Sequence, residues 1–268
     1  MNAATDGGFR DLQGAAAIEA AFRRGPRPLF IPYLTLGDPT PEETRARLWE
    51  LARAGAGIVE LGVPYSDPLA DGSVLREAAV RALRHRIGIG EALAFVRSLR
   101  DEGFALPLVL FAYANPLFRF GAERFAREAL AAGVDAVLVP DLPPEESGDV
   151  LGFLRAVGIP LIPLVALTSR GRIAERLAGR EGFVYAVSSL GTTGVRERLP
   201  EELLAFLAEI RAATSLPVAV GFGIHRREQV EMLAPYAEGI IVGSALAHLW
   251  AEGGSVEAFV RELFSGVW

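Results

Sequence analysis

Cysteine and lysine are both absent from this chain of 268 residues. Without cysteine there are no disulfide bonds, no thiolate nucleophile and no zinc site built on cysteine. All 27 basic residues are arginine, so no lysine side chain is present to form a Schiff base. This excludes pyridoxal chemistry and amine-based aldol cleavage by the chain itself. Catalysis therefore has to rest on carboxylates, hydroxyls, arginines and backbone amides.

Histidine is scarce, and positive charge is outnumbered by negative charge. His85, His225 and His248 are the three histidines, and no two of them have the spacing of metal ligands, so we expect no metal site. The net charge of −6 excludes the basic surface that nucleic acid or anionic lipid requires. No run of 18 apolar residues occurs, and the first 17 residues lack the apolar segment of a signal peptide. We expect no membrane span and a cytoplasmic location.

Short, continuously apolar segments recur along the chain and alternate with segments of helical period. Eight of them have the length and β-branched content of strands: 28–35, 57–63, 107–113, 135–141, 160–166, 182–189, 216–223 and 238–245. Continuous apolar runs are typical of strands that are covered on both faces, as in a parallel sheet. We therefore expect eight parallel strands.

Amphipathic helical segments separate these strands, and further helices are predicted at about 10–24 and 255–265. No linker divides the chain. The eight strand–helix units thus predict an α/β fold, a single (β/α)8 TIM-barrel domain over residues 1–268 with an extra N-terminal helix and about ten disordered residues before it. A doubly wound open sheet, the main alternative, usually has a glycine-rich fingerprint after its first strand, where this chain has TLGDPTP (35–41).

A glutamate interrupts the apolar second strand. In GIVELGVPYSDPLADG (57–72), Glu60 stands between Val59 and Leu61. Burying a carboxyl there is costly unless it is paired or functional, and burial raises its pKa toward the range useful for a general acid or base. Two interpretations stay open at this point: a proton-transfer group, or a structural glutamate bonded to a polar group of a neighbouring strand.

Asp71 follows eleven residues later, in a loop that is too long for an ordinary connection between a strand and its helix. In a barrel of this type, the loops after the strands form the active site. A carboxylate in such a loop suits the binding or polarising of an N–H or O–H group. The structural alternative is a loop cap or turn former, which is also the interpretation we favour for Asp67.

Glycines gather after the last three predicted strands. The segments are SSLGTTGVRER (188–198), GFGI (221–224) and VGSA (242–245). Small residues let backbone amides approach an anion, and a helix that starts beyond Ser244 adds the positive end of its dipole. Barrels often bind phosphate at this place. We expect a phosphate site here, the alternative being that the glycines serve tight turns.

Seven segments of distinctive sequence occur in order along the chain. They are IPYLTLGDP (31–39), VELGVPYSDPLADG (59–72), YANP (113–116), LVPDLPPEES (138–147), GTTGVR (191–196), GFGI (221–224) and VGSA (242–245). Together they resemble the tryptophan synthase alpha subunit family over nearly the whole chain from about residue 28. The resemblance implies a carbon–carbon lyase that cleaves indole-3-glycerol phosphate to indole and glyceraldehyde 3-phosphate by a retro-aldol reaction.

The resemblance also implies roles for individual residues. Glu60 matches the general acid/base of the family, and Asp71 matches the group that binds the indole N–H and stabilises positive charge on the ring in the transition state. The remaining matches are Tyr33, Phe111, Tyr113, Leu138 and Tyr185 in the indole pocket, Thr193 as the loop residue that closes on Asp71, and Gly194, Gly223, Gly243 and Ser244 around the phosphate.

The family usually works as an α2β2 heterotetramer in tryptophan biosynthesis. The partner implied is the tryptophan synthase beta subunit, which carries pyridoxal phosphate and receives indole through an internal channel. No cofactor or metal is implied for the present chain. It departs from the family pattern at Ser73 and Arg76, where proline and glutamine are usual.

Three alternatives to a coupled alpha subunit remain. The first is a stand-alone lyase that releases free indole, for which Ser73 and Arg76 are the only hints. The second is a non-catalytic regulatory partner of the beta subunit, which the presence of Glu60 and Asp71 disfavours. The third is another phosphate-binding barrel, such as a sugar-phosphate isomerase, which the segment 59–72 disfavours.

Overall fold

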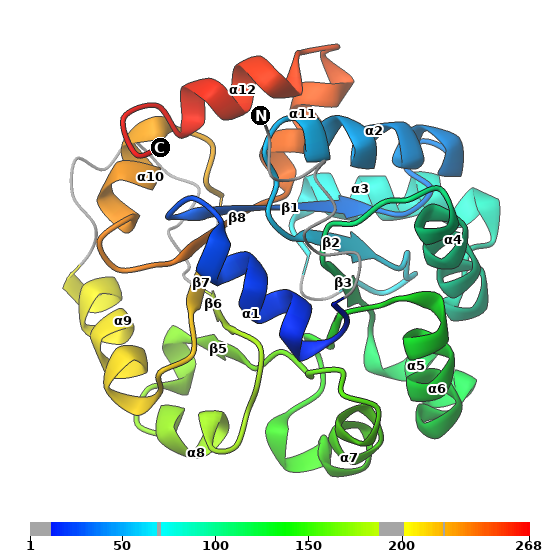
Figure 1. Cartoon of the computed structure of the whole chain (residues 1–268), viewed down its shortest axis with the longest axis horizontal. Coiled ribbons are helices and arrows are strands. Elements are labelled where there is room, and N and C mark those ends of the chain that lie inside the picture. The colour runs from blue at the N-terminus through cyan, green and yellow to red at the C-terminus, as the bar shows by residue number, and fades with distance from the viewer. Residues whose placement is uncertain (1–11, 69–70, 188–200, 222) are drawn as a thin grey trace.

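Eight parallel strands form one sheet in the computed structural model, which describes residues 12–68, 71–187, 201–221 and 223–268. The strands follow the order β4-β3-β2-β1-β8-β7-β6-β5. They are β1 (Leu29–Thr35), β2 (Val59–Gly62), β3 (Leu108–Phe111), β4 (Ala136–Leu138), β5 (Leu164–Ala166), β6 (Val184–Val187), β7 (Val218–Gly221) and β8 (Gly239–Val242). Val137 of β4 forms a parallel bridge to Leu161, just before β5, so the two edges of the sheet meet (Figure 1). The predicted (β/α)8 barrel is confirmed.

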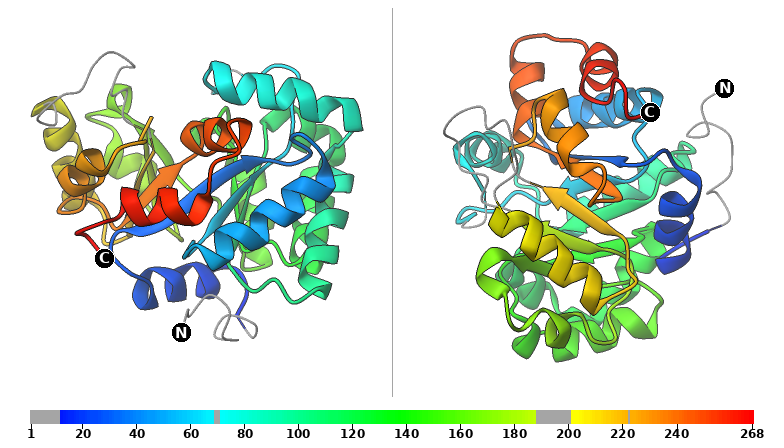
Figure 2. Two further views of the ribbon diagram at one scale, coloured as in Figure 1. Left: turned by 90° about the horizontal axis from the view of Figure 1, so that it is seen from above. Right: turned by 90° about the vertical axis from the view of Figure 1, so that its left-hand side faces the viewer.

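Helices surround the strands on the outside of the barrel, as the views in Figures 1 and 2 agree. They are α2 (Pro41–Arg53), α3 (Ser73–Ala82), α4 (Ile89–Asp101), α5 (Ala114–Phe120), α6 (Ala122–Ala132), α7 (Gly148–Ala156), α8 (Ile173–Leu177), α9 (Glu201–Ala213), α10 (Arg227–Leu233), α11 (Ser244–Ala251) and α12 (Val256–Leu263). Short 3₁₀ turns add η1 (Leu83–His85), η2 (Pro144–Glu146) and η3 (Leu167–Ser169). Among the helices of the described ranges, none is long and apolar enough to cross a membrane.

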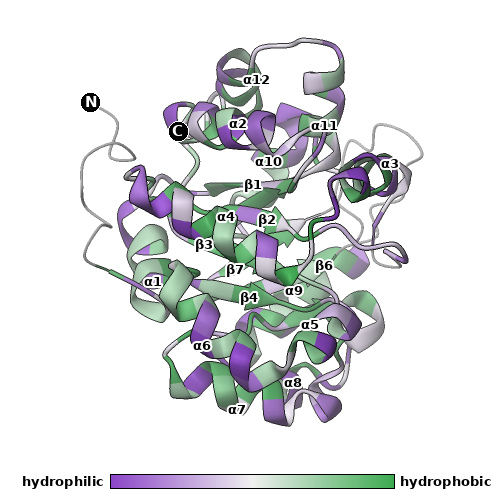
Figure 3. Ribbon diagram, turned by 90° about the vertical axis from the view of Figure 1, so that its right-hand side faces the viewer, coloured by the Kyte–Doolittle hydropathy of each residue, from purple (hydrophilic) through white to green (hydrophobic). Residues whose placement is uncertain are grey.

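The barrel wall separates two apolar cores. Successive side chains of a strand point to opposite faces, so Val59 and Leu61 of β2 pack outward against the helices. Ile58 and Val109 point inward instead and belong to the core inside the barrel. Figure 3 shows the same division, with apolar strands in the centre and polar residues on the outer surfaces of the helices. Both faces of the sheet are therefore dry, as the continuous apolar runs of the sequence predict.

The N-terminal helix α1 (Ala15–Arg24) lies across one end of the barrel (Figure 1). Ile18 and Phe22 belong to the core inside the barrel, where the rings of Phe22 and Phe183 lie 5.5 Å apart. The amide of Ala15 donates to the carbonyl oxygen of Gly158, just before the β5 segment. This end therefore holds the amino ends of the strands. The extra N-terminal helix is confirmed, whereas the first ten residues lie outside the described ranges.

Asp135 ties this helix to the barrel. Its carboxylate accepts hydrogen bonds from the amides of Gly14 (3.1 Å) and Leu108 (2.9 Å) and from the Nη2 atom of Arg100 (2.7 Å). The Arg100 guanidinium donates to three backbone carbonyl oxygens as well. The buried carboxylate and the half-buried guanidinium thus have several hydrogen-bond partners each, which is the condition under which such an ion pair is tolerated.

Several strands are shorter than the apolar segments that predict them. The segment 160–166 is apolar throughout, but β5 begins only at Leu164. Pro160 and Pro163 have no N–H to donate, which interrupts the ladder before that point. Residues 188–189 of the sixth predicted strand lie outside the described ranges.

Substituting Asp135→Ala should lower the free energy of unfolding by about 3–5 kcal/mol, because it leaves the buried Arg100 guanidinium without its counter-charge. The measurement is urea denaturation at neutral pH. The matched control is Glu19→Gln, which breaks an exposed ion pair to Arg23 and should cost less than about 0.5 kcal/mol. Equal effects of the two substitutions would contradict a structural role for Asp135.

Candidate active site

The predicted residues converge at the interior of the barrel. The pairing of β1 with β2 places Tyr33 beside Glu60, and the pairing of β3 with β4 places Phe111 beside Leu138. Tyr113, just after β3, belongs to the same interior core, and Tyr185 of β6 packs against it. Five strands thus contribute to one site. The barrel interior thus brings Glu60 and the five aromatic and aliphatic residues predicted for the indole pocket together.

Glu60 is completely buried in β2, with neighbouring strands on both sides. Within the described part of the chain, neither carboxyl oxygen has a hydrogen-bond partner. Burial raises the pKa of this carboxyl from its ordinary value near 4.5 to about 8. Glu60 is therefore protonated at neutral pH. The structural interpretation, a glutamate bonded to a neighbouring strand, finds no support in the contacts.

Asp71 lies in the loop between β2 and α3, and its carboxyl points to the aromatic residues of the site. The hydroxyl of Tyr113 donates to its Oδ2 atom at 3.2 Å. Helix α3 has Gly72 at its N-cap and no side-chain cap, so Asp71 is no helix cap. Burial raises the pKa of Asp71, whereas the hydrogen bond from Tyr113 and the charge of Arg76 act in the opposite direction.

Tyr33, which is buried, and Tyr185, which is partly buried, lie near both carboxyl groups. Burial raises the pKa of Tyr33 well above its ordinary range, and the nearby carboxyl groups of Asp71 and Glu60 raise it further. The pKa of Tyr185 is raised by burial and by the same two carboxyl groups. Both phenols therefore stay protonated. Tyr33 lies beside Glu60, Tyr113 donates to Asp71, and Phe111 packs against both rings, so the two carboxyl groups belong to one aromatic site.

Aromatic rings line this space on the side of β3. Phe111 packs edge-on against Tyr33, with ring centres 5.4 Å apart, and against Tyr113, at 5.9 Å. Tyr65, from the Asp71 loop, lies 5.0 Å from Tyr113 and accepts a hydrogen bond from the side-chain amide of Asn115. Sequence reasoning missed Tyr65 and Asn115 as residues of the site. The sequence signal that could have identified them is that Tyr65 lies in the distinctive segment 59–72 and Asn115 in the segment 113–116.

Two strand glycines make room for the tyrosines. A Cβ atom at Gly62 of β2 would lie 2.3 Å from the hydroxyl of Tyr33, and one at Gly221 of β7 would lie 2.8 Å from the hydroxyl of Tyr185. A larger residue at either place would displace a buried ring. Sequence reasoning did not single out Gly62, and it assigned Gly221 only to a segment that approaches an anion.

The predicted phosphate end lies two strands away from Glu60. Strand β1 separates β2 from β8, a distance of roughly 10 Å at ordinary strand spacing. Gly243 directly follows β8, and Ser244 begins α11, whose first amides have no acceptor within the helix. Gly223, with φ +55°, follows the neighbouring strand β7. Thr193 and Gly194 lie outside the described ranges.

Side chains from three elements anchor the loop that follows β1. Arg81, in the last turn of α3, donates to both carboxylate oxygens of Asp38, at 2.6 and 3.0 Å. Arg47 of α2 donates to the carbonyl oxygen of Asp38, and His85 of η1 contacts that of Pro39. The far end of α3 is thereby fixed to the barrel. The first residue of α3, Ser73, follows Asp71 after the N-cap residue Gly72.

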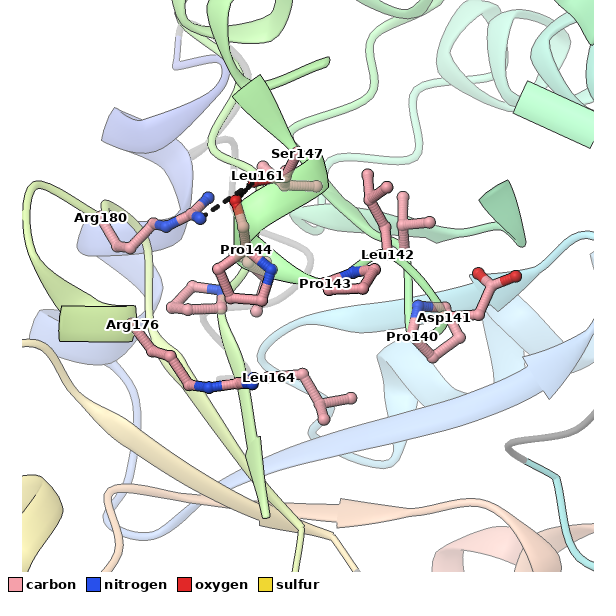
Figure 4. Close-up of a pocket in the computed structure, with 13 residues that line it drawn as sticks. Pro140, Asp141, Leu142, Pro143, Pro144, Ser147, Leu161, Leu164, Arg176 and Arg180 are labelled. Atoms are coloured by element: carbon pink, nitrogen blue, oxygen red, sulfur yellow. Dashed lines mark hydrogen bonds between the residues drawn. The ribbon is translucent and has the colours of Figure 1, made fainter. Parts of the chain in front are cut away.

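A separate cavity of about 290 Å³ lies between the segment after β4 and helix α8 (Figure 4). Pro144, Leu164, Arg176 and Arg180 are among its lining residues, and Arg180 donates to the hydroxyl of Ser147 at 3.1 Å. None of the predicted site residues lines it. Across the described ranges, no group of three or more acidic, histidine or cysteine side chains is arranged to hold a metal ion.

Known proteins resemble this chain over most of its length. The family model of the tryptophan synthase alpha chain matches residues 20–261. This chain belongs to the tryptophan synthase alpha chain family. The alpha chain of Halalkalibacterium halodurans is 47% identical over 235 residues, 88% of either chain, and that of Geobacillus kaustophilus is 49% identical over 219 residues, 82% of either chain.

Solved structures of the family share the fold. A chain of the tryptophan synthase α2β2 complex from Pyrococcus furiosus superposes with a TM-score of 0.82 at 38% identity, covering 90% of this chain and 99% of that one. The alpha chain from Legionella pneumophila has a TM-score of 0.81 at 30% identity, covering 94% and 99%. The family predicted from the seven sequence segments is confirmed.

The burial of Glu60 predicts a pH-dependent stability. Between pH 4.5 and about 8, the folded chain holds a proton on Glu60 that the unfolded chain releases. The free energy of unfolding should therefore fall as the pH rises through this window, by about 5 kcal/mol at most, and level off above it. Glu60→Gln removes this titration, so the variant should gain stability relative to the parent chain as the pH rises.

Chemical denaturation at intervals from pH 5 to pH 9 measures the difference between the two proteins. The matched control is Glu257→Gln on the exposed face of α12, whose difference from the parent should not change across the same window. A constant difference for Glu60→Gln would contradict a raised pKa of Glu60.

Proposed function

We propose that this chain cleaves indole-3-glycerol phosphate to indole and glyceraldehyde 3-phosphate, as the alpha subunit of a tryptophan synthase. The observation that carries the proposal is Glu60, a carboxyl inside the barrel that has no hydrogen-bond partner among the described residues and is protonated at neutral pH. It belongs to the same aromatic site as Asp71, in a chain of the alpha family. Two carboxyl groups in different environments suit an acid and an electrostatic stabiliser.

Glu60 serves as the general acid and then as the general base. Its carboxyl gives a proton to the indole ring carbon that bears the glycerol chain, which makes the ring an electron sink. The resulting carboxylate takes the proton of the adjacent hydroxyl group. The bond between the hydroxyl-bearing carbon of the glycerol chain and the ring carbon then breaks. Its electrons return to the ring, and the hydroxyl-bearing carbon becomes an aldehyde. Glu60 ends protonated, so no lysine, metal or cofactor is needed in this chain.

Asp71 binds the indole N–H and stabilises the positive charge that develops on the ring. A carboxylate placed where charge develops acts most strongly when water is excluded around it. Tyr113 holds the Oδ2 atom of Asp71. Among the described residues, none donates to the Oδ1 atom, which leaves that oxygen for the substrate.

The remaining predicted residues bind the substrate. Tyr33, Phe111, Leu138 and Tyr185, together with Tyr113, enclose the indole ring. The amides after Gly223 and Gly243 and at Ser244 bind the phosphate with the dipole of α11. The family resemblance assigns Thr193 to the loop that closes on Asp71 and Gly194 to the binding of the phosphate. The two strand widths between Glu60 and the phosphate end accommodate the glycerol chain.

The partner is the beta subunit of tryptophan synthase, in an α2β2 complex that carries pyridoxal phosphate on its beta chains. The support is membership in a family whose Pyrococcus furiosus representative forms such a complex. The reaction takes place in the cytoplasm, since a phosphate ester does not cross a membrane and is used in the compartment where it is made.

The test is the release of indole from indole-3-glycerol phosphate by the purified chain, alone and with a beta subunit. Slow release alone and a large rise on mixing are expected. Glu60→Gln should lose at least about a hundredfold in kcat while still binding substrate. Fast release of indole by the chain alone, with no change in rate when the beta subunit is added, would identify a stand-alone lyase. No release in either mixture, with binding between the proteins demonstrated, would identify a regulatory partner.

Asp71→Asn should keep the fold and lower kcat by roughly 10²–10³-fold, because a neutral amide no longer stabilises positive charge on the ring. The measurement is single-turnover cleavage in the complex, which isolates the chemical step. Asp67→Asn in the same loop is the matched control and should affect single-turnover cleavage far less. An unchanged rate for Asp71→Asn would make Asp71 a structural residue.

A further inference from the structure

Arg76 is the first cation beyond Asp71 along the chain and lies one helical turn into α3 (Ser73–Ala82). Its Nη1 atom donates to the carbonyl oxygen of Asp71 at 3.4 Å. Its own amide donates to the carbonyl oxygen of Gly72 in the first turn of the helix. The guanidinium is therefore held over the peptide segment that carries Asp71, while the side chain as a whole is exposed to solvent.

The groups around the Asp71 carboxyl come from four elements. Tyr113, after β3, donates to it directly, and Tyr33 of β1 and Tyr185 of β6 are protonated phenols nearby. Arg76 of α3 contributes the positive charge that acts on Asp71 within the described residues. The two charged groups form no direct ion pair in that part of the chain, so the attraction acts through space. The carboxylate thus keeps an oxygen for a ligand.

We propose that Arg76 keeps Asp71 ionised during the cleavage reaction and so acts as a positioning residue that extends activity toward lower pH. The inference rests on the proposed function, in which Asp71 works as a carboxylate. Burial of Asp71 favours its neutral form, which stabilises no positive charge on an indole ring. A nearby cation that leaves the carboxylate oxygens uncovered opposes this effect without occupying the binding position.

The exposure of Arg76 limits the size of the effect. Opposite charges in direct contact shift a pKa by one to three units, whereas a solvent-exposed charge several ångströms away shifts it by about half a unit. Such an interaction is screened by salt, since the Debye length falls to about 3 Å at 1 M ionic strength. Both the size and the salt dependence therefore distinguish a through-space charge effect from a packing role.

The experiment is a charge series at position 76 in the α2β2 complex. The kcat for indole release is measured against pH at low salt for the parent chain and for Arg76→Lys, Arg76→Gln and Arg76→Glu. The midpoint of the acid limb should stay in place for Lys, rise by about 0.5 pH unit for Gln and by about 1 unit for Glu. At 1 M salt, the four midpoints should converge.

Arg84→Gln is the matched control, because Arg84 is an exposed arginine in η1, directly after α3. Its acid limb should coincide with that of the parent chain. A second readout without turnover is the titration of the Asp71 carboxyl by carbon NMR, assigned through Asp71→Asn. The midpoints of that titration should follow the same order as the kinetic ones.

Two outcomes overturn the inference. One is an acid limb that does not move along the series in a parent chain that cleaves the substrate. The other is an equal displacement in all three variants, Lys included, which would assign Arg76 a packing role. A parent chain that releases no indole defeats the proposed function instead, and the NMR titration then decides separately whether Arg76 sets the ionisation of Asp71.

Discussion

A carboxyl group is buried inside the barrel without any hydrogen-bond partner among the described residues, and the rest of the site is organised around that constraint. Glu60 cannot ionise cheaply there, because no hydrogen-bond donor among the described residues compensates its loss of solvation. The strand register fixes its position between β1 and β3. The neighbouring phenols of Tyr33 and Tyr185 stay neutral and supply no counter-charge. Glu60 therefore keeps a proton at neutral pH, at which an exposed glutamate is ionised.

Asp135 shows how differently the same kind of group behaves at the other end of the barrel. Its carboxylate is nearly as buried as that of Glu60, but two amides and the Arg100 guanidinium satisfy it. It joins the segment before α1 to the strands. The amino ends of the strands therefore serve stability and the carboxyl ends serve chemistry, a division typical of this fold.

Asp71 owes its position to contacts on both sides of its loop. Tyr113 holds the carboxyl from β3, and the pair of Arg81 with Asp38 fixes the far end of α3 to the loop after β1. The aromatic ring of Tyr65 packs against Tyr113 from within the same loop. A loop held in this way keeps its carboxylate at the mouth of the barrel and still exposes an oxygen to the substrate. The position of the Asp71 carboxylate and its ionisation thus depend on different residues.

The sequence by itself determined the class of fold, the family and the two candidate carboxylates. Continuous apolar runs and helical periods are local patterns, and the segment around Glu60 is local as well. The tertiary structure decided that Glu60 has no hydrogen-bond partner in the described part of the chain, that Tyr113 binds Asp71 from 42 positions away, and that Gly62 and Gly221 make room for two tyrosines. It also shortened β5, where prolines interrupt an apolar run. Whether a buried group is satisfied depends on which distant segments surround it, and barrel closure, rather than any local pattern, brings those segments together.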